Sequence, residues 1–520
     1  MTFRNLYLNL NRPEYLPSVE VILSDLIWQA VEIDATAWLD HSSGAKGSPI
    51  DGLPLGLVYE SLTKKQPKDL TIVASRSRSE AEEWLSQLLD SGFQVSGKLE
   101  AKILAESILN SLRAPKAQDA KSRSAAPFTP AIALLQNNAG ISAKKNPANW
   151  AHIVEKMYRL GATAPTCESS VTIRLLTAMN QLLSQDNLLR ATDHFIQNSL
   201  LPHEVSEKLR EINSAPYEYF QLDSSIAEMA PISGSFTLCP FQWFHNSWNS
   251  LTAQNWSRAL SSRRWLAWAT TVLRAGIGFG YLWEARWYEV LSREVIDLSI
   301  DAQRTPKTHD ALLRETMRAP LAVWLSSESP VPDRDVSSRL KKLVERGNGL
   351  EAVFREFFRE TERSDPSLLR ESVEKGLKIL SENQVFVQKL QTVWSGDNPE
   401  KSKRTWETIK YSLMTRASDS EQLGEEFNQQ RDYYGLFRPY KNSRYLFVDP
   451  STEWIAVVAS LVRDDPAKTV TLKPVRDAMN ALGLQPSVDV LTACLEDAGL
   501  ARSAPDADTG IKVASAFGAR

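Results

Sequence analysis

Five residues near the start of the chain have the side chains that metal-dependent nucleases use. They are Asp34, Asp40, Asp69, Glu100 and Lys102, and the last two form a Glu-x-Lys pair. Carboxylates that converge at strand ends hold the two metal ions of such enzymes. Here, however, a predicted helix separates Asp69 from Glu100, so the two acids do not lie on adjacent hairpin strands. These five residues are our catalytic candidates, and the alternative is that they are scattered surface charges.

Residues 74–80, ASRSRSE, could bind an anion. They follow a predicted strand and open a predicted helix, where backbone N–H groups favour negative charge. The stretch resembles the part of NADP-binding folds that holds the 2′-phosphate, but no G-x-G-x-x-G motif accompanies it. Arg76, Arg78 and Ser79 are therefore our anion-binding candidates, and we expect no cofactor. The alternative is a capped helix with solvated arginines.

Aromatic and basic residues alternate over residues 431–449, RDYYGLFRPYKNSRYLFVD, which we call the hairpin segment. Guanidinium groups beside stacking rings are typical of surfaces that bind single-stranded nucleic acid. The pattern also suits a β-hairpin whose rings pack inward, or a protein interface. The residues that would contact nucleic acid or a partner are Arg431, Tyr434, Phe437, Arg438, Tyr440, Lys441 and Arg444.

Residues 240–300 are dense in tryptophan and arginine, and two interpretations are open. Large rings build helical cores, with arginines stacked on them or extended toward water. Alternatively, the arginines form one continuous exposed stripe that follows a phosphate backbone. The side chains concerned are Trp243, Trp248, Trp256, Trp265, Trp268, Trp283 and Trp287, with Arg258, Arg263, Arg264, Arg274, Arg286 and Arg293.

Several chemistries find no support in the sequence. Cys167, Cys239 and Cys494 lie far apart and the histidines lack ligand spacing, so we expect no metal site. The net charge of -3 over 520 residues gives no whole-chain attraction for nucleic acid. Residues 265–283 have the length of a membrane span, but the central Arg274 favours a buried helix without membrane contact. The first residues show no signal-peptide pattern, which predicts a cytoplasmic protein.

The elements that must position these residues indicate a mainly α, multidomain chain. Residues 1–112 indicate an α/β domain, with a strand over residues 3–9 and a capped helix over residues 79–89. Residues 113–130 contain three prolines and no apolar period, which is typical of a linker. Residues 131–430 have the apolar spacing of successive amphipathic helices and form the predicted helical body.

Residues 450–520 indicate a helix, a short strand, two further helices and two strands around a polar turn. This order and these lengths resemble a winged helix, whose third helix commonly enters the major groove of DNA. Here the third helix contains Asp489, Glu496 and Asp497 and no Lys or Arg. Phosphate neutralisation supplies most of the affinity for DNA. We therefore expect this winged-helix-like module to bind protein instead.

The sequence predicts a non-catalytic subunit or adaptor of a prokaryotic multi-protein assembly that acts on nucleic acid, with other protein subunits as partners. Its organisation resembles accessory proteins of prokaryotic genome-defence systems, in the arrangement of parts and not in a motif. Two alternatives stay open. One is a metal-dependent nuclease or nucleotide-processing enzyme with the α/β domain as its catalytic unit. The other is a nucleic-acid-binding protein that uses the hairpin segment and the Trp/Arg-rich residues.

Overall fold

The structure is a computed structural model, and some predicted sites lie outside its described residues. The model describes residues 2–11, 16, 19–31, 127–134, 149–163, 170–199, 201, 203–215, 226, 229–232, 239–318, 336–396, 403–413, 434–439, 446–501 and 511–517. Within these ranges the protein is mainly helical, as expected, and has four short strands. The predicted linker and the capped helix over residues 79–89 fall almost wholly outside the described residues.

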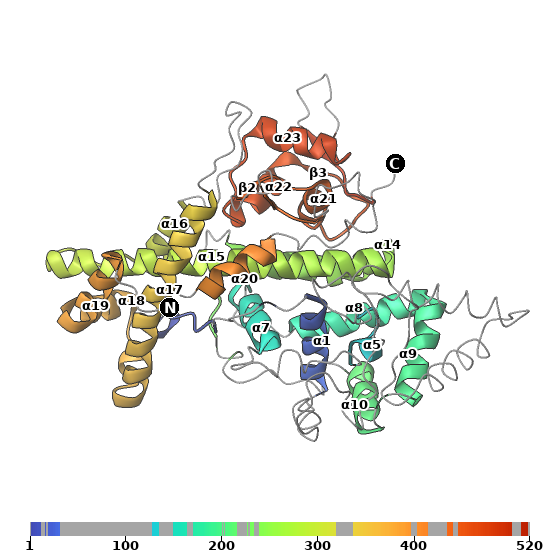
Figure 1. Cartoon of the computed structure of the whole chain (residues 1–520), viewed down its shortest axis with the longest axis horizontal. Helices are drawn as coiled ribbons and strands as arrows, with labels where there is room; N and C mark the ends of the chain where they lie inside the picture. The colour runs from blue at the N-terminus through green and yellow to red at the C-terminus, as the bar shows by residue number, and fades with distance from the viewer. Residues whose placement is uncertain are drawn as a thin grey trace, which may run out of the picture.

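A single long helix, α15 (Ser262–Ile300), runs through the centre of the molecule (Figure 1). Its 39 residues give a rod about 58 Å long. Residues 275–285 are all buried, and a helix that is enclosed on every side can be apolar all round. None of the described helices combines the length and apolar character that a membrane span requires.

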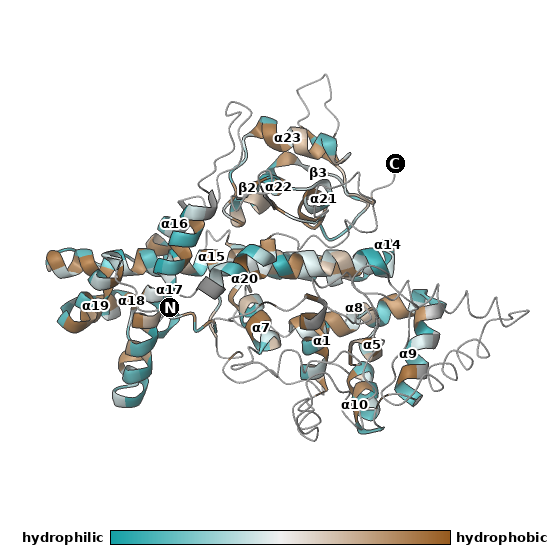
Figure 2. Ribbon diagram, viewed as in Figure 1, coloured by the Kyte–Doolittle hydropathy of each residue, from teal (hydrophilic) through white to brown (hydrophobic). Residues whose placement is uncertain are grey.

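Other helices surround α15 and complete the helical body (Figure 1). Figure 2 shows hydrophilic and hydrophobic residues alternating along most of these helices, as the amphipathic spacing predicted. In chain order they are η1 (Phe3–Leu6), α1 (Val19–Ala30), α5 (Pro130–Leu134), α7 (Trp150–Leu160), α8 (Val171–Gln185), α9 (Asn187–Ser199), α10 (His203–Ser214), α13 (Pro240–Thr252), α14 (Gln254–Ala259), α16 (His309–Arg318), α17 (Val336–Ser364), η2 (Leu368–Arg370), α18 (Val373–Glu382), α19 (Gln384–Trp394) and α20 (Lys403–Leu413).

The glycines of α15 mark the places where its neighbours approach most closely. A Cβ atom on Gly276 would lie 2.9 Å from the ring of Phe244 on α13. One on Gly278 would meet Ser412 and Leu413 of α20. Glycines weaken an isolated helix, yet α15 is continuous here because α13 and α20 pack directly against its backbone.

The first residues of the chain are packed into the helical body, and the strand expected over residues 3–9 is wrong. Residues 3–6 form the 3-10 helix η1, and the ring of Phe3 lies against Gly376 of α18. The Trp287 indole donates to the Leu6 carbonyl (2.9 Å), and the Tyr288 hydroxyl accepts from the backbone N–H of Leu8 (3.2 Å). Helix side chains satisfy this backbone, so no neighbouring strand is needed.

Three enclosed carboxylates join helices by accepting hydrogen bonds from the first turn of a neighbour. Asp25 of α1 accepts from Ala151 N of α7 (3.0 Å), and Glu155 of α7 accepts from Val171 N of α8 (3.1 Å). Asp193 of α9 accepts a hydrogen bond from Ala131 N of α5 (3.0 Å). Burial raises the pKa of all three carboxyl groups, to about 6 for Asp25. These contacts satisfy helix N-termini that would otherwise lack acceptors.

Two short strands form a hairpin within residues 431–449, as one of the interpretations of that segment predicted. β1 (Phe437–Pro439) pairs antiparallel with β2 (Leu446–Val448), with Arg438 opposite Phe447. A backbone hydrogen bond from Leu436 N to Leu413 O (3.1 Å) joins this hairpin to the end of α20.

The described part of residues 450–520 has the predicted order of helix, strand, helix and helix, and we call it the C-terminal module. Of the two strands expected at its end, the described residues contain β4 and an isolated bridge at Ala501. It comprises α21 (Thr452–Ser460), β3 (Val470–Thr471), α22 (Leu472–Ala481), α23 (Val488–Asp497) and β4 (Lys512–Val513). Serine side chains cap two of its helices: Ser451 accepts from Trp454 N, and Ser487 accepts from Val490 N. β3 pairs antiparallel with β4, with Val470 opposite Val513. Ala501 forms an isolated antiparallel bridge to Val513 as well.

Candidate docking surface on the C-terminal module

The predicted nuclease and anion-binding residues cannot be placed. The catalytic candidates Asp34, Asp40, Asp69, Glu100 and Lys102 lie outside the described residues, as do Arg76, Arg78 and Ser79. Among the residues that are described, no group of three or more His, Cys, Asp and Glu side chains is arranged to hold a metal ion. The nuclease alternative therefore stays a prediction.

The described residues of the hairpin segment contribute to the core. Phe437 is only 5% exposed, and Tyr434 is half-buried against the same core cluster. A buried phenyl ring does not offer its face to a base, so Phe437 is a packing residue in this structure. For Arg438 the structure describes the backbone alone, whereas Arg431, Tyr440, Lys441 and Arg444 lie outside the described residues.

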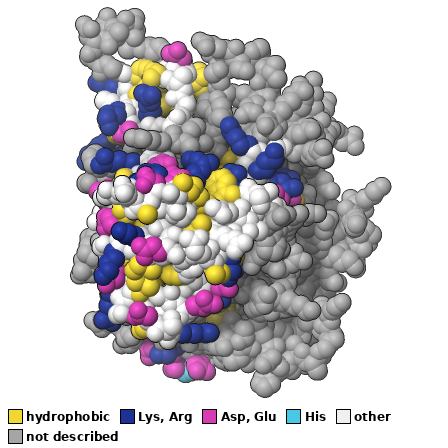
Figure 3. Space-filling model, turned by 90° about the vertical axis from the view of Figure 1, so that its left-hand side faces the viewer, with side chains coloured by type: hydrophobic (Ala, Val, Ile, Leu, Met, Phe, Trp, Pro, Cys, Tyr) yellow, Lys and Arg dark blue, Asp and Glu magenta, His cyan; other side chains and the backbone are white. Residues whose placement is uncertain are grey.

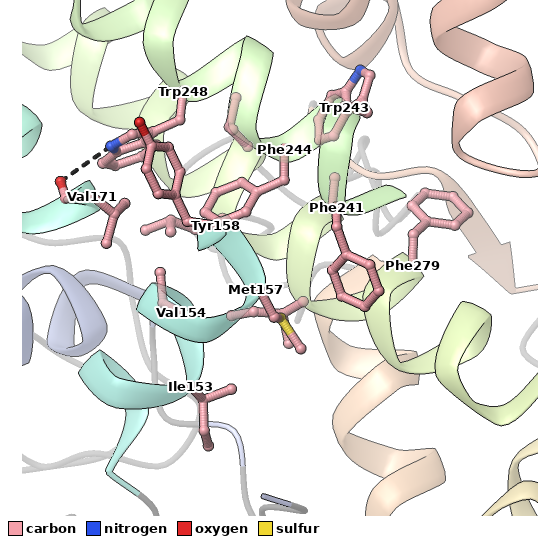
Figure 4. Close-up of a cluster of buried hydrophobic side chains, with 14 of the residues drawn as sticks. Ile153, Val154, Met157, Tyr158, Val171, Phe241, Trp243, Phe244, Trp248 and Phe279 are labelled. Carbon is pink, nitrogen blue, oxygen red and sulfur yellow. Dashed lines mark hydrogen bonds between the residues drawn. The ribbon is translucent and has the colours of Figure 1, made fainter. Parts of the chain in front are cut away.

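The tryptophans of residues 240–300 are core residues, as the simpler interpretation predicted. All seven are at most 5% exposed. Figure 4 shows Trp248 packed beside Tyr158 and Phe244, with its indole N–H donating to the Val171 carbonyl at 3.2 Å. Their rings provide no stacking surface for bases.

The accompanying arginines do not form one continuous exposed stripe. Arg258, Arg263 and Arg264 are exposed near the start of α15, and Arg293 is exposed near its end. Between them, Arg274 is half-buried and donates to the Ser412 carbonyl (3.1 Å).

The outer face of α23 is an exposed acidic surface of the C-terminal module. Leu491 and Leu495 are fully buried against the module, and among the helices and strands α23 packs chiefly on α21. The opposite face is exposed and carries Asp489, Glu496 and Asp497. Figure 1 shows α23 at the side of the module that faces away from the helical body.

One large apolar side chain is exposed at the start of α23. Val488 begins α23 and is 42% exposed. Cys494 lies on the same helix and is half-buried, and burial raises the pKa of its thiol to about 11. The thiol is therefore protonated at neutral pH and is a poor nucleophile. The chemistry that this face offers is charge and shape for binding.

The module is attached to the helical body through backbone and ring contacts. The Trp256 indole of α14 donates to the Arg463 carbonyl (2.9 Å), and the Phe517 ring contacts Trp268 of α15 edge-on at 5.6 Å. Arg463 is buried and donates to the carbonyls of Lys468 (2.8 Å) and Val513 (3.0 Å), which holds β4 beside α21. These contacts leave α23 outside the attachment.

Comparison of the chain with protein-family models, with curated proteins and with solved structures finds no match. Function must therefore be inferred from side-chain geometry.

A second surface cluster was missed by the sequence analysis. Arg286 and Arg346 both donate to the buried carboxylate of Glu289, and Arg293 and Arg346 both lie over the ring of Trp394. Arg286 and Arg293 were singled out for their tryptophan neighbours along the chain, but the aromatic ring that matters comes from α19. Only the spacing of Arg286, Glu289 and Arg293 on one helical face could have suggested the site.

Proposed function

We propose that this protein is a non-catalytic subunit or adaptor of a multi-protein assembly acting on nucleic acid, and that α23 docks on a basic surface of a protein partner. The observation that carries the proposal is the exposed face of α23, which has three carboxylates and no basic residue. Val488 is exposed at the start of the same helix. A basic partner would neutralise the carboxylates, and a small apolar contact would add affinity.

The element order of the C-terminal module supports its assignment as winged-helix-like. Its helices and strands follow one another as helix, strand, helix, helix and strand, and β4 is bridged both by β3 and by Ala501. In a winged helix the third helix is commonly the one offered to DNA. Because the negative charge on α23 would repel phosphate groups, a protein partner fits this helix better than DNA.

The positions of the acids on α23 also favour a binding role. Glu496 and Asp497 lie in the last turn, where the helix dipole is unfavourable to negative charge, and no basic residue occupies that turn. Residues that lower helix stability are frequent where function requires them. A partner with basic residues would offset this cost.

In this proposal the first residues of the chain belong to the helical body, because η1 and α1 pack into it. The α/β domain predicted for residues 1–112 is then formed by the residues after α1. Residues 113–130 form the linker, residues 131–430 the rest of the helical body and residues 450–520 the winged-helix-like module after the hairpin segment. Genome defence is the kind of assembly that the organisation resembles, and it belongs to the proposal on that ground alone.

The experiment begins with capture of the partner by the full-length protein, tagged at its C-terminus because residues 3–11 are packed into the body. Purification from the producing cells is done with and without nuclease, and the retained protein is then purified and its Kd measured. The test variant is Asp489→Asn with Asp497→Lys. The matched control is Glu374→Gln with Glu382→Lys, which makes the same two changes of charge at the two ends of α18.

We expect the α23 variant to bind the partner at least about tenfold more weakly, and the α18 control to bind like the wild type. Both variants change the net charge equally, so a general charge effect would weaken both. Equal binding by the wild type and the α23 variant would contradict the proposal, as would loss of the partner on nuclease treatment.

A further inference from the structure

The cluster around Trp394 holds its arginines in fixed positions. The Trp394 indole N–H donates to the Ser292 hydroxyl (3.0 Å), which sets the orientation of the ring. The guanidinium carbons of Arg293 and Arg346 lie over that ring, 4.8 Å and 4.4 Å from its centroid. Stacking on an aromatic face restricts a side chain that is otherwise flexible.

A buried carboxylate fixes two of the three arginines from below. Glu289 is 1% exposed and accepts from Arg286 Nη1 (2.7 Å) and from Nε and Nη2 of Arg346. One carboxylate thus serves two guanidinium groups, and Arg293 adds a third at the exposed edge. The cluster therefore carries two positive charges in excess of its single negative charge.

The basic surface continues along α17. Lys342 and Arg339 precede Arg346 by four and seven residues, so the three side chains share one helical face. Both Lys342 and Arg339 are exposed. In the face drawn in Figure 3, several Lys and Arg side chains lie across the upper part, with acidic side chains among them.

From this geometry we infer that the cluster of Arg286, Arg293 and Arg346 around Trp394 binds the phosphodiester backbone of a nucleic acid. Guanidinium groups match the oxygen geometry of phosphate, and groups already held in place lose little conformational entropy on binding. The excess charge is local, so it acts although the whole chain is slightly acidic. This inference does not depend on the docking of α23, because the cluster belongs to α15, α17 and α19 of the helical body.

The test uses the full-length protein and fluorescein-labelled duplex DNA, single-stranded DNA and single-stranded RNA of one sequence, with anisotropy measured from 50 to 200 mM KCl. The variants are Arg293→Gln and Lys342→Gln. Neither side chain takes part in the Glu289 ion pairs, so both variants should fold. The control is Arg258→Gln on α14, which Figure 1 shows at the opposite end of α15 from α19.

We expect at least one of the three nucleic acids to bind in a salt-dependent manner. Removal of one phosphate contact should reduce the log–log salt slope by about one. On duplex DNA, the wild type should therefore lose more affinity with salt than Arg293→Gln does. The ratio of their affinities, wild type over variant, should be about threefold to fourfold smaller at 200 mM than at 50 mM salt. The Arg258→Gln control should keep the wild-type slope.

A second pair of variants separates binding from folding. Trp394→Phe keeps a ring beneath the guanidinium groups and should retain most of the affinity for nucleic acid. Trp394→Ala removes the ring, and its affinity should fall by the same factor as that of Arg293→Gln. The inference is overturned if the wild type binds none of the three probes at 50 mM KCl. It is also overturned if Arg293→Gln and Lys342→Gln bind like the wild type, or if Arg258→Gln loses as much affinity as they do.

Discussion

His245 and His309 are ionisable residues packed against aromatic rings inside the helical body. The His245 ring lies 4.2 Å from Tyr158, and the His309 ring lies 5.7 Å from Trp287. Burial lowers the pKa of both imidazoles to about 4. Since an unfolded chain binds these protons near pH 6.5, each histidine makes stability fall as the pH falls from 6.5 to 4.

The enclosed carboxylates have the opposite effect on how stability depends on pH. Asp25, with its pKa raised to about 6, takes up its proton earlier in the folded state than in the unfolded chain. Its contribution therefore falls as the pH rises from about 3.8 to 6. A pH profile of the wild type mixes the two signs, so the histidine effect must be measured as a difference between variants.

We predict that His309→Gln loses less stability on acidification than the wild type does. Between pH 7 and pH 5 the difference should be about 2 kcal/mol in the free energy of unfolding, because the variant has no imidazole to protonate. Urea unfolding at the two pH values measures it. The control is His203→Gln, an exposed residue of α10, which should follow the wild type. Parallel profiles for wild type and His309→Gln would contradict the prediction.

At the scale of elements, the crossing of α15 and α17 depends on a missing side chain. A Cβ atom on Gly347 would lie 2.5 Å from the Cα atom of Ala285 and 2.9 Å from its carbonyl oxygen. These are backbone atoms of the central helix, which cannot move aside. The same crossing brings Arg346 to Glu289, so the close approach also builds the arginine cluster.

Gly347→Ala should therefore destabilise the protein, although alanine is the better helix former by about 1 kcal/mol. We expect a net loss of about 1–3 kcal/mol, since overpacking forces the two helices apart. Thermal unfolding measures the loss, with Arg359→Ala on the exposed face of α17 as a control that should change little. An increase in the melting temperature of Gly347→Ala would show that the crossing is looser than described.

At the scale of the whole molecule, a few contacts join the C-terminal module to the helical body. The Trp256 indole donates to the Arg463 carbonyl (2.9 Å). The Arg463 guanidinium in turn donates to the carbonyl of Val513 in β4. A buried carbonyl that loses its donor costs about 1–3 kcal/mol. The module should therefore respond to a change on α14 although none of its own residues is altered.

We predict that Trp256→Phe raises amide hydrogen exchange in α21 and β4 more than in the helical body. The matched variant is Trp265→Phe, which removes an equivalent indole bond to the Leu251 carbonyl (3.0 Å) within the body. Hydrogen exchange with mass spectrometry compares the two. If both variants raise exchange equally across the chain, the module and the body unfold as one unit.

The sequence by itself determined the elements whose signals are local. Ser451 and Ser487 cap α21 and α23, and Gly483 and Gly499 follow α22 and α23 with φ of 76° and 70°. Caps, left-handed glycines and apolar spacing act over a few residues, so they can be read without the fold. The acidity of α23 was likewise visible in the sequence, and its exposed face follows from the helical spacing of Leu491 and Leu495.

Only the tertiary structure decided which residues meet. The alternating residues 3–9 suit a strand, but the surrounding helices supply the hydrogen bonds that a sheet would have given. Arg293, Arg346 and Trp394 come from three helices, and their meeting depends on helix crossings set by contacts such as that of Gly347 with Ala285. Apolar spacing tells which face of a helix is buried, but it carries no information about the partner or the crossing angle, and these are what assemble the arginine cluster.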